Sequence, residues 1–304
     1  MIDTNKKISV PQIFCLLVLT RISSEVVYPR TAATDAAAAI CAAGLAEVIQ
    51  LVLAVPAIVY SFRGNDFYGA VCRKNKFWGV VVGVTAALLM ISSAIMAIVY
   101  SSEFTIKNLL TGGSMWVVFI ITAAFAVYVA VEGAEAAARS GAIFLVISIL
   151  VSITVVLADI PNMKFIDEKI AFDFELKSFI EEVIKDIPRG GDYLVFTAFL
   201  PYVAKKNMRS SGRCSLLFGL SAIIIVTGIA LFNCFVLREF YGYVEYPFIA
   251  AASLSDIAFF KRLDGAAAAV WVLCAAFRAG VFLFCASGVL RNIFHIFRSE
   301  RSHQ

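Results

Sequence analysis

Residues 136–158 read AAARSGAIFLVISILVSITVVLA, a run in which Arg139 carries the only charge. A helix needs about 20 predominantly apolar residues to cross the hydrocarbon core of a bilayer, so this run predicts a membrane-spanning helix. The chain contains seven further runs of the same kind, of which the sixth in the series is short. The eight predicted spans cover residues 9–29, 34–62, 77–100, 114–131, 136–158, 191–204, 213–237 and 265–290.

The composition of the chain points to the same class of protein. Of the 304 residues, 61% are hydrophobic and 16% are charged, whereas an ordinary soluble domain has about 45–50% apolar and about 25% charged residues. The 26 basic and 22 acidic residues give a net charge of only +4 and form no basic stripe, which argues against nucleic acid as a partner. We therefore expect an all-α, polytopic helical membrane protein that lies in the lipid bilayer.

Residues that carry enzyme and metal chemistry are scarce or poorly spaced. None of the seven cysteines shares a CxxC spacing with another, and the two histidines, His295 and His303, lie near the C-terminus. Such a set offers no zinc or haem site. The chain also contains no GxSxG or HExxH motif. We expect no metal, no cofactor and no enzymatic activity.

The basic residues predict how the spans are oriented, because cytoplasmic loops carry an excess of lysine and arginine. If the N-terminus is cytoplasmic, the cytoplasmic segments hold 14 of these residues and the short outer loops hold 5. We therefore expect both termini in the cytoplasm. Lys6, Lys7 and the apolar residues 12–20 could also be read as a cleaved signal peptide. The sequence that follows them has no clean small-residue cleavage site, which argues against that interpretation.

The long outer loop 159–190 contains apolar residues at a helical spacing. This spacing predicts a short amphipathic helix on the outer surface, and a solvated linker is the alternative. The apolar positions are Phe172, Leu176, Phe179, Ile180, Val183 and Ile184.

Charged residues inside a span are rare and point to function. Arg21 and Glu25 are four residues apart in the first span, with Ser23 and Ser24 between them. Hydroxyl groups can satisfy the backbone where a membrane helix opens, so we interpret this segment as a candidate break. The alternative is an ion pair that only holds the helix in the bundle.

A second candidate break is the sequence PRGGDY at residues 188–193, which leads into the short sixth span. Broken helices in corresponding halves of a chain indicate a transporter-type binding site, and the start of a half-helix attracts a carboxylate. The alternative is a glycine-rich loop with Asp192 as the helix N-cap.

Two further charges lie in the middle of spans. Glu47 is in the second span and Arg278 is in the eighth. Either residue could pair with the other or with a substrate, and Glu47 could also relay protons. Together with Arg21, they are the candidates for ion coupling or for pairing within the membrane.

Several motifs follow one another along nearly the whole chain. They are Ile8–Gln12, Arg21–Ser24, Tyr28-Pro29, Tyr128–Arg139, Asp192, Leu200-Pro201, Tyr246-Pro247, Phe260–Asp264 and Trp271. In this order and spacing they resemble the spore germination permease family, the B subunits of germinant receptors, within the amino acid–polyamine–organocation superfamily.

The resemblance implies a LeuT-like inverted-repeat architecture in which helices one and six are unwound around a central site. Residues 1–304 would form one transmembrane domain, made of a first five-helix repeat (1–158), an extracytoplasmic loop (159–190) and a truncated second repeat of about three helices (191–304). It also implies a germinant-sensing subunit that works with A and C receptor subunits in the spore inner membrane.

For such a subunit we expect a small ligand, an amino acid, between helices one and six. Its carboxylate would meet the open backbone of a candidate break, and a neighbouring acidic side chain would meet its ammonium group. The expected ligand-binding residues are Ser23, Ser24, Glu25, Gly190, Gly191, Asp192 and Tyr193.

Two departures from the family pattern bear on function. Ser23 and Ser24 stand where glycines are expected in helix one, and serine opens a helix less readily than glycine. The chain also ends after the eighth helix, whereas the family usually has ten, which counts against transport. The alternatives are an ion-coupled amino-acid transporter, with Glu25, Glu47 or Asp192 at the coupling site, and a degenerate structural subunit of a membrane complex.

Overall fold

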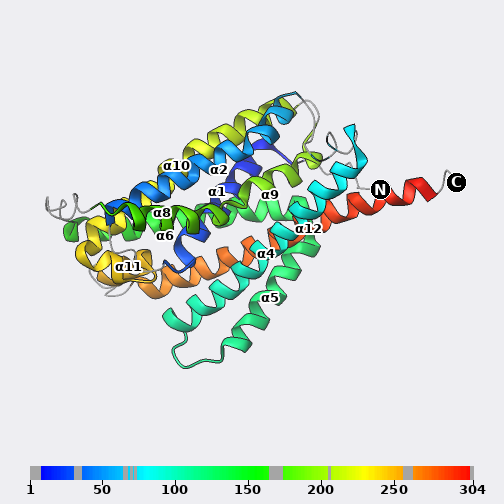
Figure 1. Ribbon diagram of the computed structural model, residues 1–304. Helices are drawn as coiled ribbons and strands as arrows, with labels where there is room; N and C mark the ends of the chain where they lie inside the picture. Colours follow the sequence, from blue (N-terminus) through cyan, green and yellow to red (C-terminus); the bar gives the residue numbers. More distant parts are fainter. Residues whose placement is uncertain are drawn as a thin grey trace.

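The computed structural model describes residues 8–30, 36–63, 68, 71, 74–163, 174–204, 207–255 and 263–301, which form a bundle of helices (Figure 1). Within this part of the chain there is no strand, so the all-α prediction is confirmed. The long helices are α1 (Val10–Val27), α2 (Ala36–Phe62), α4 (Lys76–Asn108), α5 (Met115–Glu132), α6 (Ala134–Asp159), α10 (Met208–Leu237) and α12 (Asp264–Arg301).

Shorter helical segments connect the long helices. They are η1 (Ile160–Asn162), α8 (Leu176–Asp186), η2 (Ile187–Gly190), α9 (Asp192–Phe199), η3 (Leu200–Tyr202), η5 (Arg238–Tyr243) and α11 (Pro247–Leu254). Part of the predicted family motif Phe260–Asp264 and the predicted helix position Phe172 lie outside the described residues.

Seven helices in the described part of the chain are long and apolar enough to cross a membrane. They match seven of the eight predicted spans and make the chain an integral membrane protein. The predicted span at 191–204 differs, because it holds only α9, which has 8 residues, followed by η3. Pro201 follows α9 closely and limits it at its C-terminal end, because a proline inside a helix removes a hydrogen bond.

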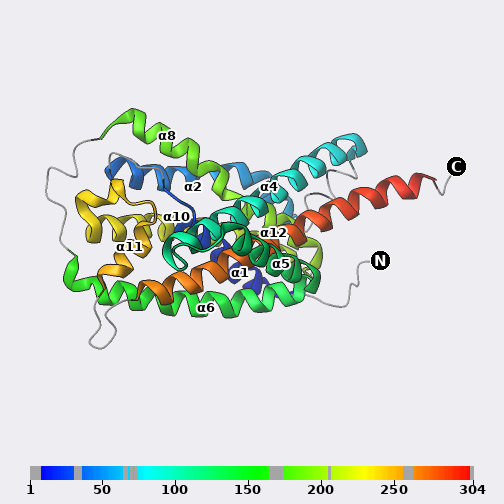
Figure 2. The ribbon, with the colours of Figure 1, turned by 90° about the horizontal axis from the view of Figure 1, so that it is seen from below.

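The amphipathic helix predicted from the loop is present as α8, which packs along α2 (Figure 2). The Gln50 side-chain amide, in the middle of α2, donates to the backbone oxygens of Asp186 (3.1 Å) and Ile187 (3.3 Å). The end of α8 therefore lies deeper in the bundle than the predicted surface position, because Gln50 supplies the donors that a helix end needs. Together α8, η2, α9 and η3 form one discontinuous segment.

Contacts between distant segments define the two ends of the bundle. At one end, Lys107 lies 2.7 Å from the Glu245 carboxylate and the backbone amide of Arg30 donates to the Glu245 oxygen at 2.9 Å; we call this the Lys107 end. At the other end, the backbone amide of Ile8 donates to the oxygen of Tyr202 at 3.2 Å. Asp159, which ends α6, accepts from the hydroxyl of Ser255 at 2.9 Å at the Lys107 end. The ends of α4 and α6 and the segment after α1 thus lie at the Lys107 end, and the segments before α1 and after α9 lie at the other.

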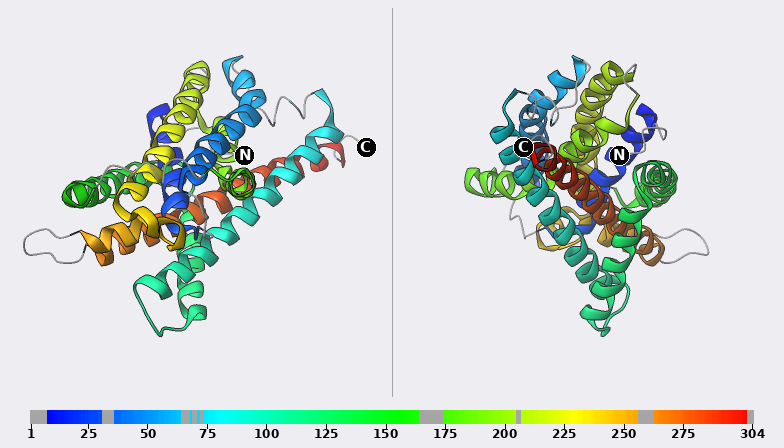
Figure 3. Two further views of the ribbon diagram at one scale, coloured as in Figure 1. Left: turned by 60° about the vertical axis from the view of Figure 1, so that its left-hand side comes forward. Right: turned by 90° about the vertical axis from the view of Figure 1, so that its right-hand side faces the viewer.

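The centre of the bundle is α1, whose residues from Leu16 to Val27 are all buried. It packs against α6, α10, α12 and α9. By contrast, α5 lies at the edge of the bundle and is mostly exposed (Figure 3). The buried surface of α1 brings its polar residues into contact with the segments that surround it.

Candidate functional site

Four arginine–carboxylate pairs lie together in the middle of the bundle and toward the Lys107 end. Their side chains are at most 12% exposed, and among them the positive and negative charges are equal in number, so the group is neutral. Neutrality explains how it can be buried, since an uncompensated charge inside a membrane protein is costly. We call this group the charge cluster. Its pairs are Arg21–Glu47, Arg30–Glu25, Arg189–Asp186 (3.0 Å) and Arg278–Asp192 (3.4 Å).

The predicted break at Arg21–Glu25 is wrong, because α1 continues to Val27. The hydroxyl groups of Ser23 and Ser24 donate to the backbone oxygens three residues earlier, at 2.9 and 2.8 Å. This bonding satisfies the serines within an intact helix. The predicted proximity of Arg21 and Glu25 is confirmed at 3.9 Å, but each has a closer partner on another segment.

The predicted discontinuity at residues 188–193 is confirmed, since η2 and Gly191 separate α8 from α9. The two glycines allow close packing there. A Cβ atom on Gly190 would overlap the side chain of Gln50, and one on Gly191 would lie 2.8 Å from the Phe282 ring. The backbone at the break is therefore fitted tightly against α2 on one side and α12 on the other.

Arg278 of α12 connects the elements that meet at this break. Its guanidinium donates to the backbone oxygens of Thr20 in α1 and Arg189 in η2, the latter at 3.0 Å, besides pairing with Asp192 in α9. It also lies 5.5 Å from the centre of the Tyr28 ring. Glu47 and Arg278 do not pair with each other. Glu47 pairs with Arg21, and Arg278 pairs with Asp192.

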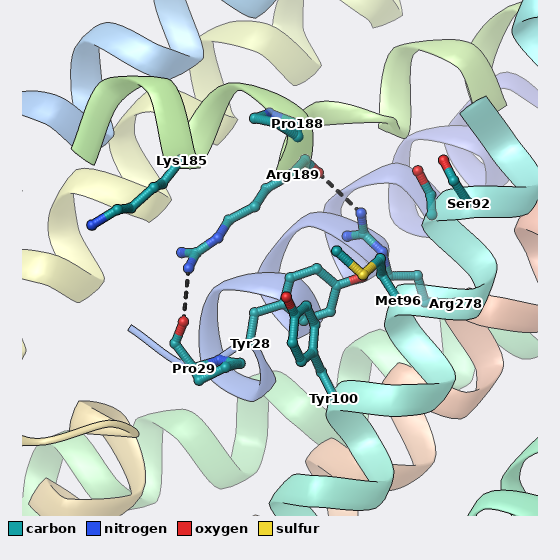
Figure 4. A pocket seen from close by; sticks show the side chains of 10 residues that line it. Tyr28, Pro29, Ser92, Met96, Tyr100, Lys185, Pro188, Arg189 and Arg278 are labelled. Carbon is teal, nitrogen blue, oxygen red and sulfur yellow. Dashed lines mark hydrogen bonds between the residues drawn. The ribbon is translucent and has the colours of Figure 1, made fainter. Parts of the chain in front are cut away.

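A cavity of about 330 Å³ lies beside Arg278, between the end of α1, α4 and η2 (Figure 4). Among the described residues that line it, three are basic and none is acidic. The Tyr28 hydroxyl is buried and has no hydrogen-bond partner among the described residues. We call this space the arginine cavity; it is lined by Tyr28, Pro29, Ser92, Ser93, Met96, Tyr100, Lys185, Pro188, Arg189 and Arg278.

Figure 4 shows how Arg189 closes one side of the arginine cavity. Its guanidinium donates to the backbone oxygen of Pro29 at 3.0 Å, and its own backbone oxygen accepts from Arg278. The cavity opens where Ser92 and Met96 are exposed. A ligand in the cavity meets two guanidinium groups and two tyrosine rings, those of Tyr28 and Tyr100.

The predicted ligand residues are distributed around this cavity rather than collected in it. Gly190 and Gly191 form the break beside it, and Asp192 lies behind Arg278. Tyr193 packs instead on Phe218 of α10, with ring centres 5.2 Å apart. Ser23, Ser24 and Glu25 do not line the cavity.

Sequence reasoning missed several side chains at the site. Arg189 lies within the predicted break at residues 188–193, and Lys185 lies just before it. The neighbouring residues Ser92 and Ser93 interrupt an apolar span. Ser92 and Ser93 were recognisable in the sequence as polar residues near the middle of a span. Tyr100, in contrast, looks in the sequence like an ordinary aromatic residue near a helix end.

Arg30 and Tyr241 fix the outer edge of the charge cluster. Arg30 donates to the Tyr241 hydroxyl at 2.7 Å. Burial raises the pKa of Tyr241 to about 12, even though the positive charge of Arg30 acts in the opposite direction. Burial alone would lower the pKa of Arg30, but the Glu25 carboxylate outweighs it and raises that pKa above its ordinary value. Arg30 is therefore charged and Tyr241 neutral at physiological pH.

Within the described residues, no three His, Cys, Asp or Glu side chains come together as a metal site would require. A family model described as "Spore germination protein" matches residues 7–302 of the chain. No curated protein matches it.

Proposed function

The chain belongs to the spore germination protein family, and from this premise we propose that it is a germinant-sensing, permease-like subunit of a spore germination receptor. Family membership and seven apolar helices make it a germination-related membrane protein of permease type. The finer proposal is that it binds a small ligand in the arginine cavity, works with A and C receptor subunits, and lies in the spore inner membrane. We propose ligand binding, without catalysis.

The observation that carries the proposal is the arginine cavity at the α8–α9 discontinuity. Its walls come from α1, α4, η2 and α12, so a ligand there contacts four segments at once. Ligand pockets are usually apolar with a few polar groups that fix orientation. Here those polar groups are Arg189, Arg278 and the free hydroxyl of Tyr28.

The charges favour a zwitterionic amino acid as the ligand. Arg278 and Arg189 suit a carboxylate, because guanidinium groups bind carboxylates with paired hydrogen bonds. The carbonyl end of α1, next to Tyr28, carries a partial negative charge that suits an ammonium group. Because the charge cluster is already neutral, a zwitterion leaves it neutral, whereas a pure anion or cation adds an unbalanced charge.

The structure favours sensing over ion-coupled transport in one respect. The candidate coupling residues Glu25, Glu47 and Asp192 each have an arginine partner. A coupling cation would therefore have to compete with an arginine for each of these carboxylates. Uptake into proteoliposomes driven by an ion gradient would favour the transporter instead.

Spores that lack only this gene test the proposal directly. We expect them to lose dye release in response to one or a few amino acids, and the wild-type gene to restore it. An unchanged response to every amino acid in the panel would contradict the sensor proposal. Restoration by a variant in which Tyr28, Arg189 and Arg278 are all replaced would favour the structural-subunit alternative.

Replacing Tyr28 by phenylalanine should weaken ligand sensing and leave folding intact. The hydroxyl has no partner in the described structure, so its removal breaks no internal bond. One hydrogen bond to the ligand contributes about 1 kcal/mol, which corresponds to roughly a fivefold higher amino-acid concentration for half-maximal germination. The matched control is Tyr128→Phe on the exposed face of α5. Equal responses from both variants would show that the Tyr28 hydroxyl does not contact the ligand.

A further inference from the structure

We propose that a second cavity binds one acyl chain of a membrane lipid, from the leaflet at the Lys107 end. This cavity of about 440 Å³ lies between α1, α6, α10, α11 and α12. It is on a different side of α1 from the charge cluster and shares no lining residue with the arginine cavity. We call it the lipid cavity.

The lipid cavity opens sideways onto the surface that faces the bilayer. Its floor is formed by buried residues of α1, Val18 and Val26 among them. At its rim, Ile149 and Ile153 of α6 are 40% and 49% exposed. Ile224, on the neighbouring outer face of α10, is 72% exposed. Apolar side chains at this depth in a spanning helix contact lipid chains, so the opening leads into the hydrocarbon.

The chemistry of the walls favours an apolar filling over water. The described lining includes no charged residue, and its two serines, Ser148 and Ser152, donate to backbone oxygens of their own helix at 2.9 and 2.8 Å. An apolar cavity of about 150 Å³ already stays dry and accepts apolar molecules. In a membrane, the apolar molecules at hand are the lipid chains.

The size of the lipid cavity fits a chain better than a helix. A spanning helix is a rigid rod about 10 Å across, whereas the cavity of about 440 Å³ is a bounded space between five segments. A spanning helix of a partner protein has several turns and could not enter. A flexible acyl chain can enter lengthwise.

The depth of the cavity also matches a lipid tail. Trp271 lies seven residues from the start of α12, about 10 Å below the Lys107 end, and Ser148 lies eleven residues from the end of α6, about 16 Å below it. Half the hydrocarbon thickness is about 15 Å. The cavity therefore runs from near the interface to near the middle of the bilayer, where the tails of one leaflet lie.

Trp271 makes the proposal measurable, because it lines the cavity and is only 1% exposed. The other two tryptophans, Trp78 and Trp116, are 57% and 74% exposed, and both are changed to phenylalanine so that Trp271 is the only indole. The full chain is then placed in nanodiscs of phosphatidylglycerol, either plain or brominated near the middle of the acyl chains. We expect the brominated lipid to remove most of the Trp271 fluorescence, because bromine quenches an indole that it contacts.

Filling the cavity should protect Trp271. Gly228 lines the cavity with open space around its α-carbon, so Gly228→Phe places a ring in it and should restore the fluorescence. Ile224→Phe, one turn away on the lipid-facing surface, is the matched control and should leave quenching unchanged. If Gly228→Phe does not fold, Ser152→Phe fills the cavity from α6.

Three outcomes would overturn the proposal. The first is equal Trp271 fluorescence in plain and brominated lipid. The second is quenching that persists fully when the cavity is filled. The third is loss of quenching in the Ile224→Phe control, which would trace the effect to a change in α10. None of these readings depends on germinant binding, so the lipid site and the proposed function can fail independently.

Discussion

Under the proposed function, replacing Arg278 by methionine is expected to abolish the germination response and to lower the free energy of unfolding by about 3–5 kcal/mol. Asp192 would be left as a buried charge without its partner, and breaking one side of a buried ion pair has a cost of that size. The backbone oxygens of Thr20 and Arg189 would also lose their donor. Unfolding of the detergent-solubilised chain and dye release from spores measure the two effects.

A double variant separates the structural role of Arg278 from its role toward the ligand. Arg278→Met combined with Asp192→Asn removes both charges, and neutral replacement of a buried pair is often nearly free of cost. We expect most of the lost stability to return while the germination response stays absent, because the arginine cavity still lacks its cation. A double variant that germinates like the wild type would show that Arg278 only holds the bundle together.

The long spans could be predicted from the sequence because lipid imposes a simple rule on them. Residues 136–158 were enough to place α6 within two residues at each end, since a helix in hydrocarbon must be apolar along its length. The discontinuous segment violates that rule. The first half-helix, α8, carries Lys177 and Glu181 on exposed positions, so hydropathy assigns it to a loop. The depth of its end depends on Gln50, which no local pattern connects to Asp186.

The candidate site was only partly predictable, because sequence shows which charges are buried but does not rank their partners. Arg21 and Glu25 share a helix face, and their proximity followed from spacing alone. The closer partners, Glu47 and Arg30, come from other segments and depend on how α2 and the end of α1 pack. Serine is equally ambiguous, since the same hydroxyl can support an opened helix or bond back to its own helix, as Ser23 does.

The neutral charge cluster suggests how ligand binding could be read out by partner subunits. Under the proposed function, a ligand carboxylate at Arg278 would compete with Asp192, which connects α9 to α12. Weakening that tie favours a different arrangement of the half-helices, provided that the ligand binds the two arrangements with different affinity. The backbone at the α8–α9 break must then pack against its neighbours, α2 and α12, in both arrangements.

Under the proposed function, Gly190→Ala should therefore abolish the germination response, although it adds a single methyl group. The new Cβ atom would overlap the Gln50 side chain, which is 5% exposed and cannot swing into solvent. Moving Gln50 breaks its bonds to the oxygens of Asp186 and Ile187. We expect a loss of about 1–3 kcal/mol in the free energy of unfolding, together with loss of the germination response. Gly228→Ala is the matched control, since nothing lies near its α-carbon and alanine favours a helix.

A double-mutant cycle with Gln50→Ala identifies the cause of that loss. Gln50→Ala alone destabilises, because two buried carbonyl oxygens lose their donor. In that background the space beside Gly190 is free, so adding Gly190→Ala should cost little more. The two changes would then be strongly non-additive, as residues in direct contact are. Additive effects would mean that Gly190 is needed for its backbone conformation and not for its contact with Gln50. The close fit between η2 and α2 would then not be what positions Arg189 over the cavity.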